Sequence, residues 1–331
     1  METVYDFGGK IGGARKDIAR SQTEADRRAG LPPARRSKRP PRYGVYGGSG
    51  KVYVARLTSG RRMPIPLEHF DTDTAAREWW GLQTGEPLDA RHKTATAAQA
   101  ITDETCRRPV NRARSGPDYR NGMPVAPHVF LKTFEVYGVE FGNWQDNRQA
   151  SIDQAFDALR DLAETVGIAA ESIGFGGKLG LAFGARGHGK AAAHYESARA
   201  AINLTKTAGA GCLAHEWFHA WDHQQSGGGS SLRTFTGTPG LREMAATLRG
   251  LDMYRRARRA DTTRSKPYWS EPHEMAARAF ESWVRARVEN DYLANIRTPE
   301  EFSRPGSAYP YPLAEEMPAI DAAFRKLFGV Q

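Results

Sequence analysis

Two histidines, His215 and His219, lie four residues apart in the segment 212–223, which reads CLAHEWFHAWDH. On a helix their side chains project from one face, one turn apart, so both imidazoles can bind a single zinc ion. Glu216 follows the first histidine and is placed to take a proton from a water molecule at the metal. The segment is also rich in aromatic residues, so a buried helix with two incidental histidines is the alternative interpretation.

A catalytic zinc ion usually has three protein ligands, so the two histidines need a partner elsewhere in the chain. A metzincin extension requires glycine at position 222 and histidine at position 225, but the chain has Asp222 and Gln225 there. His223 lies eight residues after His215, about 12 Å along a helix axis, which is too far to share one ion. We expect Asp222 instead to accept a hydrogen bond from a ligand imidazole and to orient it.

The segment 268–283 offers the missing ligand. It predicts a helix on which Glu274 and Glu281, seven residues apart, share a face. We predict that Glu274, in the first turn, is the third zinc ligand, with Glu271 and His273 as the alternatives. Glu281 could accept a hydrogen bond from the side of a ligand that faces away from the metal, although glutamates on such a helix face are often simply exposed to solvent. The other side of this helix is apolar and consists of Met275, Ala276, Ala279, Phe280 and Trp283.

These two stretches, His215–Asp222 and Glu274–Phe280, resemble the helices of the glutamate-zincin metallopeptidases, most closely those of the catalytic domain of anthrax lethal factor. The resemblance implies a zincin-like fold, a bound Zn²⁺ and peptide-bond hydrolysis. In that family a tyrosine shortly before the ligand glutamate assists the oxyanion. Tyr268 matches that tyrosine by position to within one residue, so the resemblance implies the same role for it.

A longer resemblance covers roughly residues 128–290 and involves large polyvalent protein-associated domain 1. The similar segments are both predicted zinc helices and the stretches Phe134–Trp144, Leu179–Gly187, Ala193–Glu196 and Ile202–Thr205. The segment Asp6–Asp17 is also similar to stretches in the same proteins. Phages and conjugative elements encode such proteins. The resemblance implies a mobile-element protein that is either made in the bacterial cytoplasm or delivered there in a phage particle, and that acts against host defence.

The net positive charge of the chain comes entirely from its first third. Residues 1–120 contain 23 Lys and Arg against 14 Asp and Glu, whereas residues 121–331 contain 24 of each. This asymmetry indicates either an arm that meets a polyanion, most plausibly nucleic acid, or a solubilising tail. Cys106 and Cys212 are the only cysteines, which argues against a disulfide framework. The sequence has neither an 18-residue apolar run nor the apolar core of a signal peptide, so we expect no membrane partner.

The sequence predicts an α+β protein in four parts. Residues 1–42 are expected to be a basic, partly disordered arm, because the proline- and arginine-rich stretch 31–42 has little to bury. Residues 43–100 are expected to form a small α/β domain that binds nucleic acid or a partner. Residues 101–127, with several arginines, are expected to form a basic linker. Residues 128–331 are expected to form a zincin-like domain with a small mixed sheet and the active-site helices.

Local patterns predict the elements that position the site. In the small domain, Tyr43–Tyr46 and Lys51–Leu57 predict a hairpin, and Asp71–Thr74 caps a following helix. In the large domain we predict strands at 129–134, 136–141, 179–183 and 201–205, helices at 151–166, 272–292 and 316–328, a helix carrying Met244 and Leu248, and a loop at 224–240. We expect residues 201–205 either to be an edge strand that pairs with an extended substrate or only to build the sheet.

The sequence therefore favours a zinc-dependent endopeptidase that cleaves a protein of the bacterial host. The alternative is an anti-defence protein that binds DNA or a host protein and has a structural or vestigial zinc site. Glu216 separates the two, because only a peptidase needs its carboxylate as a base.

Overall fold

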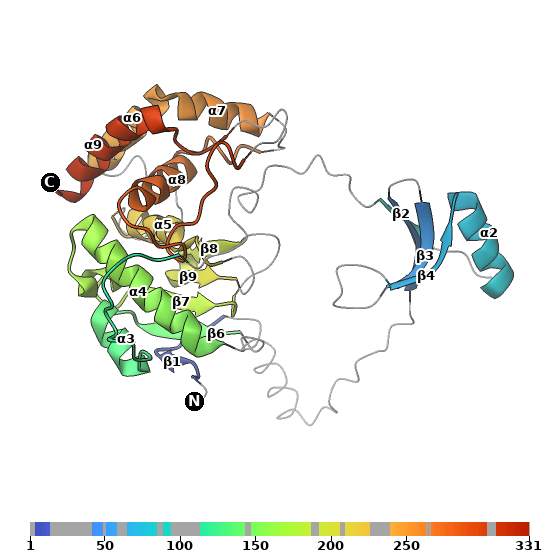
Figure 1. Cartoon of the computed structure of the whole chain (residues 1–331), viewed down its shortest axis with the longest axis horizontal. Helices are drawn as coiled ribbons and strands as arrows, with labels where there is room; N and C mark the ends of the chain where they lie inside the picture. Colours follow the sequence, from blue (N-terminus) through green and yellow to red (C-terminus); the bar gives the residue numbers. More distant parts are fainter. Residues whose placement is uncertain are drawn as a thin grey trace. The chain divides into compact units, whose positions relative to one another are not determined.

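The computed structural model of the chain describes residues 4–13, 42–48, 51–57, 65–84, 89–93, 113–142, 147–186, 192–205, 209–225, 239–262, 264, 266–302 and 309–330 (Figure 1). The chain divides into two compact units, Thr23–Ala100 and a larger one made of Met1–Gln22 with Ile101–Gln331. Both units combine helices with a sheet, which confirms the predicted α+β class. Within these residues no helix is long and apolar enough to cross a membrane.

Among its described residues, the smaller unit has a four-stranded sheet and one helix. Its strands run in the order β4-β3-β2-β5, with β2 at Arg42–Gly48, β3 at Lys51–Leu57, β4 at Ile65–Phe70 and β5 at Asp89–Lys93. Strands β2 and β3 are antiparallel neighbours, so the predicted hairpin is confirmed. Helix α2 (Asp73–Thr84) is capped by the Thr72 hydroxyl, which accepts the Ala75 N–H at 3.1 Å. Ala76 and Trp80 of α2 pack on Val52 and Val54 to form the core.

The larger unit is built on a five-stranded mixed sheet in the order β1-β6-β7-β9-β8. The strands are β1 (Phe7–Gly8), β6 (Gly138–Phe141), β7 (Gly180–Phe183), β8 (Ala193–Glu196) and β9 (Ala201–Leu204). The central three are parallel, whereas β1 and β8 pair antiparallel at the two ends. The prediction of an edge strand at 201–205 is therefore wrong, because β8 folds back beside β9 and takes the edge position.

The N-terminal segment differs from the expected arm, because residues 4–13 pack into the larger unit. Phe7 and Gly8 pair with Val139 and Gly138 of β6. The buried Glu140 carboxylate accepts the N–H groups of both Ile11 and Gly12 at 3.2 Å. A Cβ on Gly138 would lie 1.9 Å from the carbonyl oxygen of Gly9, so the close approach of these two segments requires glycine.

Seven α-helices are described in the larger unit: α3 (Pro127–Phe134), α4 (Arg148–Val166), α5 (Leu213–Gln225), α6 (Pro239–Gly250), α7 (Asp252–Asp261), α8 (Pro272–Arg285) and α9 (Met317–Phe328). In Figure 1, α4 crosses in front of the sheet, whereas α5 and α8 lie by its β8 end. The predicted helices at 151–166 and 316–328 are confirmed. Most of the predicted loop 224–240 lies outside the described residues.

Two predicted elements are wrong in type or length. The strand predicted at 129–134 is helix α3, because Pro127 opens a helical turn and Phe130 and Phe134, one turn apart, are both buried. Helix α8 ends at Arg285 instead of residue 292. The chain turns after it because the Asn290 side-chain oxygen accepts the N–H groups of residues 292 and 293.

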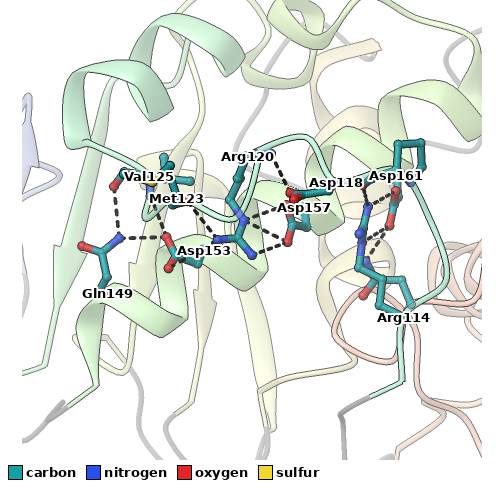
Figure 2. A network of polar contacts seen from close by, with 11 residues as sticks. Arg114, Asp118, Arg120, Met123, Val125, Gln149, Asp153, Asp157 and Asp161 are labelled. Carbon is teal, nitrogen blue, oxygen red and sulfur yellow. Dashed lines mark hydrogen bonds and ion pairs between the residues drawn. The ribbon is translucent and has the colours of Figure 1, made fainter.

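The stretch predicted as a linker is bound to α4 by ion pairs (Figure 2). Arg114 Nε lies 2.9 Å from an Asp161 oxygen, and Arg120 donates three hydrogen bonds to the Asp157 carboxylate, two from Nε at 3.0 Å and one from NH2 at 2.9 Å. Asp153 accepts the backbone N–H of Val125 at 2.8 Å. Asp153, Asp157 and Asp161 follow at intervals of four residues, so they form one acidic stripe along the helix. These two arginines are therefore engaged within the protein and contribute less to binding of a polyanion.

Aromatic packing holds α5 against α8. The Phe218 ring on α5 lies 4.9 Å from the Phe280 ring on α8, and the Trp217 ring lies 5.9 Å from the same ring. Phe324 and Phe328 of α9 cover the other side of Phe280, at 5.5 and 5.7 Å. All but the partly buried Phe328 are fully buried, and truncating a core phenylalanine typically costs about 3–5 kcal/mol. This packing fixes the face of α5 that carries the histidines opposite the first turns of α8.

Candidate metal centre between two helices

The start of α5 is held by the loop that follows α8. The N–H of Gly211, which has a φ of 85°, donates to the Tyr292 carbonyl at 2.8 Å, and the N–H of Ala214 donates to the Leu293 carbonyl at 2.9 Å. These bonds satisfy backbone groups that a helix start leaves without an intrahelical partner. The first turn of α5, with His215 and Glu216, is therefore anchored to the end of the element that carries Glu274.

The structure brings together the three predicted metal ligands. His215 and His219 lie on one face of α5, with their two Nε2 atoms 3.1 Å apart. Glu274 on α8 places Oε2 3.5 Å from His215 Nε2 and Oε1 3.7 Å from His219 Nε2. Among the described residues, these three form the group of His, Cys, Asp and Glu side chains that could hold a metal ion.

The geometry of this cluster fits one tetrahedral zinc ion. Zinc binds nitrogen and oxygen at about 2.0–2.1 Å, so two ligand atoms in a tetrahedral site lie about 3.3–3.4 Å apart. The two Nε2 atoms lie 3.1 Å apart, and each lies 3.5 or 3.7 Å from a different oxygen of the Glu274 carboxylate, so one carboxylate faces both imidazoles at distances close to that value. Glu274 Oε2 is buried and has no hydrogen-bond partner within the described part of the chain. The charge of this carboxylate is balanced in part by Arg278, whose NH1 lies 3.6 Å from Oε2, and the oxygen can still accept a cation at the cluster.

Two buried charged side chains of α8 support the cluster from behind. Glu281 is fully buried, and its Oε2 lies 3.6 Å from His215 Nδ1, the nitrogen that faces away from the cluster. Arg278 is also fully buried, with NH1 3.6 Å from Glu274 Oε2 and NH2 donating to the Trp269 carbonyl. The support expected of Glu281 is consistent with this position. Arg278 was not predicted, although its place one helical turn after Glu274 is a signal that could have identified it.

The charges of the cluster are strongly coupled. Burial lowers the pKa of His219 to about 3. Burial also acts to lower the pKa of His215, but its contacts with Glu274 and Glu281 outweigh that effect and raise it to about 10. Although burial opposes it, the contact with His215 holds the pKa of Glu274 below its usual range. Without a metal the cluster thus keeps a proton on His215, and a metal cation that binds there must displace it.

The two predicted catalytic residues lie near the cluster in different ways. Glu216 is buried on α5, close enough to His215 for its charge to act on that imidazole. Tyr268 lies in the loop before α8, where the guanidinium groups of Arg264 and Arg278 lie 4.9 and 5.8 Å from the centre of its ring. Arg278 in turn contacts Glu274, so Tyr268 is related to the cluster through Arg278.

Three other expectations were tested by this geometry. His223 binds Tyr195, with 2.7 Å between Nδ1 and the hydroxyl, and is not part of the cluster, as its spacing predicted. Glu271 is also outside the cluster and precedes α8 as its N-cap residue. The expected bond from Asp222 to a ligand imidazole is not made, because Nδ1 of neither imidazole has a hydrogen-bond partner among the described residues. Asp222 lies on the same helix as the imidazoles, and a carboxylate from the facing helix α8 reaches the back of His215 instead.

The loop before α8 is fixed by one carboxylate that the sequence did not single out. Asp261, the last residue of α7, accepts the N–H groups of Tyr268 and Trp269 at 2.9 Å and that of Ser270 at 2.8 Å. It also accepts the Ser270 hydroxyl at 2.6 Å. Burial acts to raise the pKa of Asp261, but these hydrogen bonds outweigh it and hold the pKa below its usual range. Asp261 therefore positions the loop that leads into the first turn of α8.

We expect Asp261→Ala to destabilise the protein by about 1–3 kcal/mol at neutral pH, because it leaves several N–H groups without an acceptor. The pKa of Asp261 is lower in the folded than in the unfolded chain. Its stabilisation is therefore present above the unfolded value of about 3.9 and is lost as the pH falls through the folded value. Urea unfolding of both proteins between pH 7 and pH 3 measures this. Asp252→Ala, at an exposed ion pair with Arg255, is the control, and a pH-independent difference for Asp261→Ala would contradict the assignment.

Comparison with known proteins identifies one part of this chain. Residues 260–330 match the model of large polyvalent protein-associated domain 1. The match includes the loop before α8 and helices α8 and α9, with Tyr268 and Glu274, and leaves out α5 with its histidines. It confirms the recognition of this domain within that range, and residues 128–259 of the longer resemblance lie outside it. No curated protein and no solved structure matches the chain, so the resemblance to glutamate-zincins stays a prediction.

Proposed function

We propose that this chain, which carries large polyvalent protein-associated domain 1 at residues 260–330, is a zinc-dependent endopeptidase of a phage or mobile genetic element. One observation carries the proposal. The ligand atoms of His215, His219 and Glu274 converge from two helices at separations that suit a single tetrahedral ion. Two histidines and a glutamate, with a further glutamate directly after the first histidine, are the residues with which zinc peptidases hydrolyse peptide bonds.

In this proposal each side chain has one task. His215, His219 and Glu274 would hold the zinc ion. The ion would lower the pKa of a bound water molecule to about 7 and polarise the peptide carbonyl. Glu216 accepts the proton of the attacking water and later passes it to the leaving amine nitrogen. Glu281 steadies the His215 imidazole from its Nδ1 side. The oxyanion needs a hydrogen-bond donor, for which the resemblance implies Tyr268 and the geometry also offers His273, whose Nε2 lies 3.9 Å from Glu274 Oε1.

Strand β8 is the candidate binding strand for the substrate. It ends the sheet among the described strands, runs antiparallel to β9 and packs against α5. The Tyr195 hydroxyl on β8 lies 2.7 Å from His223 Nδ1 on α5, which ties the strand to the helix with the zinc ligands. An extended peptide that adds to β8 would run alongside α5, as in other cases of strand addition to a sheet edge. This replaces residues 201–205 as the candidate.

The match to large polyvalent protein-associated domain 1 supports a link to proteins of phages and conjugative elements. We propose that the substrate is a protein of the bacterial host, that the enzyme acts in the host cytoplasm, and that host defence is its target. Delivery in a phage particle is part of the same proposal.

The basic first third of the chain favours a second function, binding of nucleic acid with a zinc site that serves only folding. The two functions differ in what removal of the metal does. A peptidase loses cleavage when zinc is removed, whereas binding through Lys and Arg side chains persists and weakens with added salt.

We expect the purified full-length protein to contain about one zinc ion per chain and to cleave specific proteins in a bacterial lysate. A strong zinc chelator should abolish the cleavage, and added zinc should restore it, because the ion is needed at every turnover. Mass spectrometry of new peptide ends identifies the cleaved proteins, and DNA binding is measured on the same samples at two salt concentrations. A protein that binds DNA equally with and without chelator and cleaves nothing supports the second function.

A further inference from the structure

Around the cluster of His215, His219 and Glu274, the side chains at the first turn of α8 are more exposed to solvent than those on α5. Those of His215 and His219 are 3% and 5% exposed, whereas those of Glu274 and His273 are 13% and 21% exposed. On the opposite side the cluster is closed by Glu281, which is fully buried. The first turn of α8 is therefore the more open side of the cluster among these residues.

His273 occupies that open side. Its Nε2 lies 3.9 Å from Glu274 Oε1, the oxygen that also faces His219 Nε2 at 3.7 Å. The ring centroids of His273 and His219 are 5.7 Å apart. His273 is not one of the three residues whose ligand atoms converge. It therefore borders the cluster through Glu274 and His219 without being one of its ligands.

We infer that His273, and not Tyr268, is the side chain that donates a hydrogen bond to the oxyanion formed from the substrate carbonyl. This inference rests on the proposed function. A neutral imidazole has one N–H, and Nε2 of His273 already faces the carboxylate side of the cluster. A donor aimed at the place where negative charge develops stabilises the transition state more than the bound substrate.

The proposed step conserves atoms, charges and protons. The water oxygen forms a bond to the carbonyl carbon, the carbonyl π pair moves onto its oxygen, and the water proton goes to Glu216. The oxyanion pair then re-forms the carbonyl π bond as the C–N bond breaks, the C–N pair leaves with the nitrogen, and that nitrogen takes the proton from Glu216, which gives a carboxylic acid and an amine. His273 keeps its proton throughout and contributes only a hydrogen bond, which strengthens as the charge on the oxygen grows.

The surroundings of Tyr268 favour another role for that residue. Its ring lies against the guanidinium groups of Arg264 and Arg278, and its N–H is bound to Asp261. Through these contacts the Tyr268 ring packs against the buried guanidinium group of Arg278. His273 lies one residue before Glu274 and contacts it directly, so it needs no rearrangement of the loop to reach the reacting oxygen.

The test compares His273→Ala with His273→Gln, which keeps an N–H donor at a similar reach, and with Tyr268→Phe, which removes only the hydroxyl. We expect His273→Ala to lower kcat by about 100- to 1000-fold on a cleaved host protein, the usual cost of an oxyanion donor, with KM and zinc content unchanged. His273→Gln should recover at least part of the loss, and Tyr268→Phe should stay within about tenfold of the unmodified protein.

A second readout needs no substrate. Cobalt replaces zinc in the same proteins, and inorganic phosphate, a tetrahedral oxyanion, is titrated while the visible absorption of the cobalt is recorded. We expect His273→Ala to weaken phosphate binding at least about tenfold without altering the spectrum of the phosphate-free cobalt protein, and His273→Gln to bind phosphate more tightly than His273→Ala.

Each opposing outcome overturns the inference in a recognisable way. Loss of cobalt or zinc from His273→Ala makes His273 a metal ligand. A large loss of kcat in Tyr268→Phe with normal His273→Ala returns the role to Tyr268. Unchanged phosphate binding in His273→Ala removes the donor role even if no substrate is found. If the unmodified protein binds neither metal, the proposed function itself fails and the inference with it, whereas a protein that binds cobalt and cleaves nothing still yields the phosphate comparison.

Discussion

Glu216→Gln is expected to keep its zinc and to lose about 100- to 10,000-fold in the rate of peptide cleavage, the range over which a general acid–base residue contributes. The substitution keeps the size of the side chain and removes its ability to accept a proton. Glu216 is buried in the first turn of α5 beside His215, where its charge acts on the imidazole. Rates of cleavage of an identified host protein, together with metal analysis of the same preparations, measure both parts of the expectation.

The matched control is Glu171→Gln, an exposed glutamate in the short 3-10 helix Ala170–Gly174, which should cleave at the normal rate. The comparison of Glu216→Gln with Glu171→Gln distinguishes three outcomes. An unchanged cleavage rate in Glu216→Gln would refute the role of Glu216 as base. Loss of zinc together with activity would give Glu216 a role in holding the site. If a phage or conjugative element keeps its anti-defence effect with Glu216→Gln, the protein acts as a binding protein instead of an enzyme.

The parts of the site that the sequence predicted are those whose signal is local. His215 and His219 are four residues apart, so the period of one helix is enough to place them together. The apolar side of α8, with Phe280 and Trp283, predicted a buried helix whose first turn presents Glu274. The pairing of α5 with α8 could not be read from either helix alone. It depends on ring contacts such as Phe218 with Phe280, between residues 62 positions apart.

The parts that were not predicted depend on contacts between distant segments. Residues 4–13 were grouped with the basic arm 1–42, whose stretch 31–42 has little to bury, but the backbone of 4–13 pairs with β6 and adds a strand to the sheet. Arg114 and Arg120 read as linker charges, and only the fold shows the aspartates of α4 that they bind. For the strand at 201–205 the sequence left open whether it lies at the edge or within the sheet, because strand order is not encoded in local periodicity, and the structure places it within the sheet.

Several of the contacts that support the metal ligands were also not predicted, because they depend on how separate elements of the fold are placed. Asp222 was expected to hold a ligand imidazole because it is near the histidines in sequence, whereas Glu281 from the facing helix lies behind His215. Asp261 and Arg278 were not identified, since a fixing hydrogen bond and a buried counter-charge acquire meaning only once α7 and α8 are placed. A sequence motif therefore locates the atoms that bind the metal better than it locates the groups that orient them.

Glu274→Gln is expected to weaken zinc binding by more than about 100-fold, which exceeds the roughly 10- to 100-fold that loss of a supporting contact costs. The glutamine keeps the shape of the side chain but lacks the negative charge that faces both Nε2 atoms at 3.5 and 3.7 Å. Glutamine is preferable to alanine, because the fully buried Arg278 lies 3.6 Å from this carboxylate and alanine would leave a cavity beside it. Competition with a fluorescent zinc chelator measures the affinity.

Glu281→Gln provides the comparison that gives this result its meaning. Glu281 faces the Nδ1 side of the same imidazole that Glu274 faces from the Nε2 side, so it can steady His215 but cannot reach the ion that the three ligands enclose. We expect its affinity loss to stay within about 10- to 100-fold. If Glu281→Gln lost more zinc affinity than Glu274→Gln, or if Glu274→Gln bound zinc normally, the ion would not lie among His215, His219 and Glu274. The peptidase mechanism built on that position would then have to be abandoned, whatever the fold of the two helices.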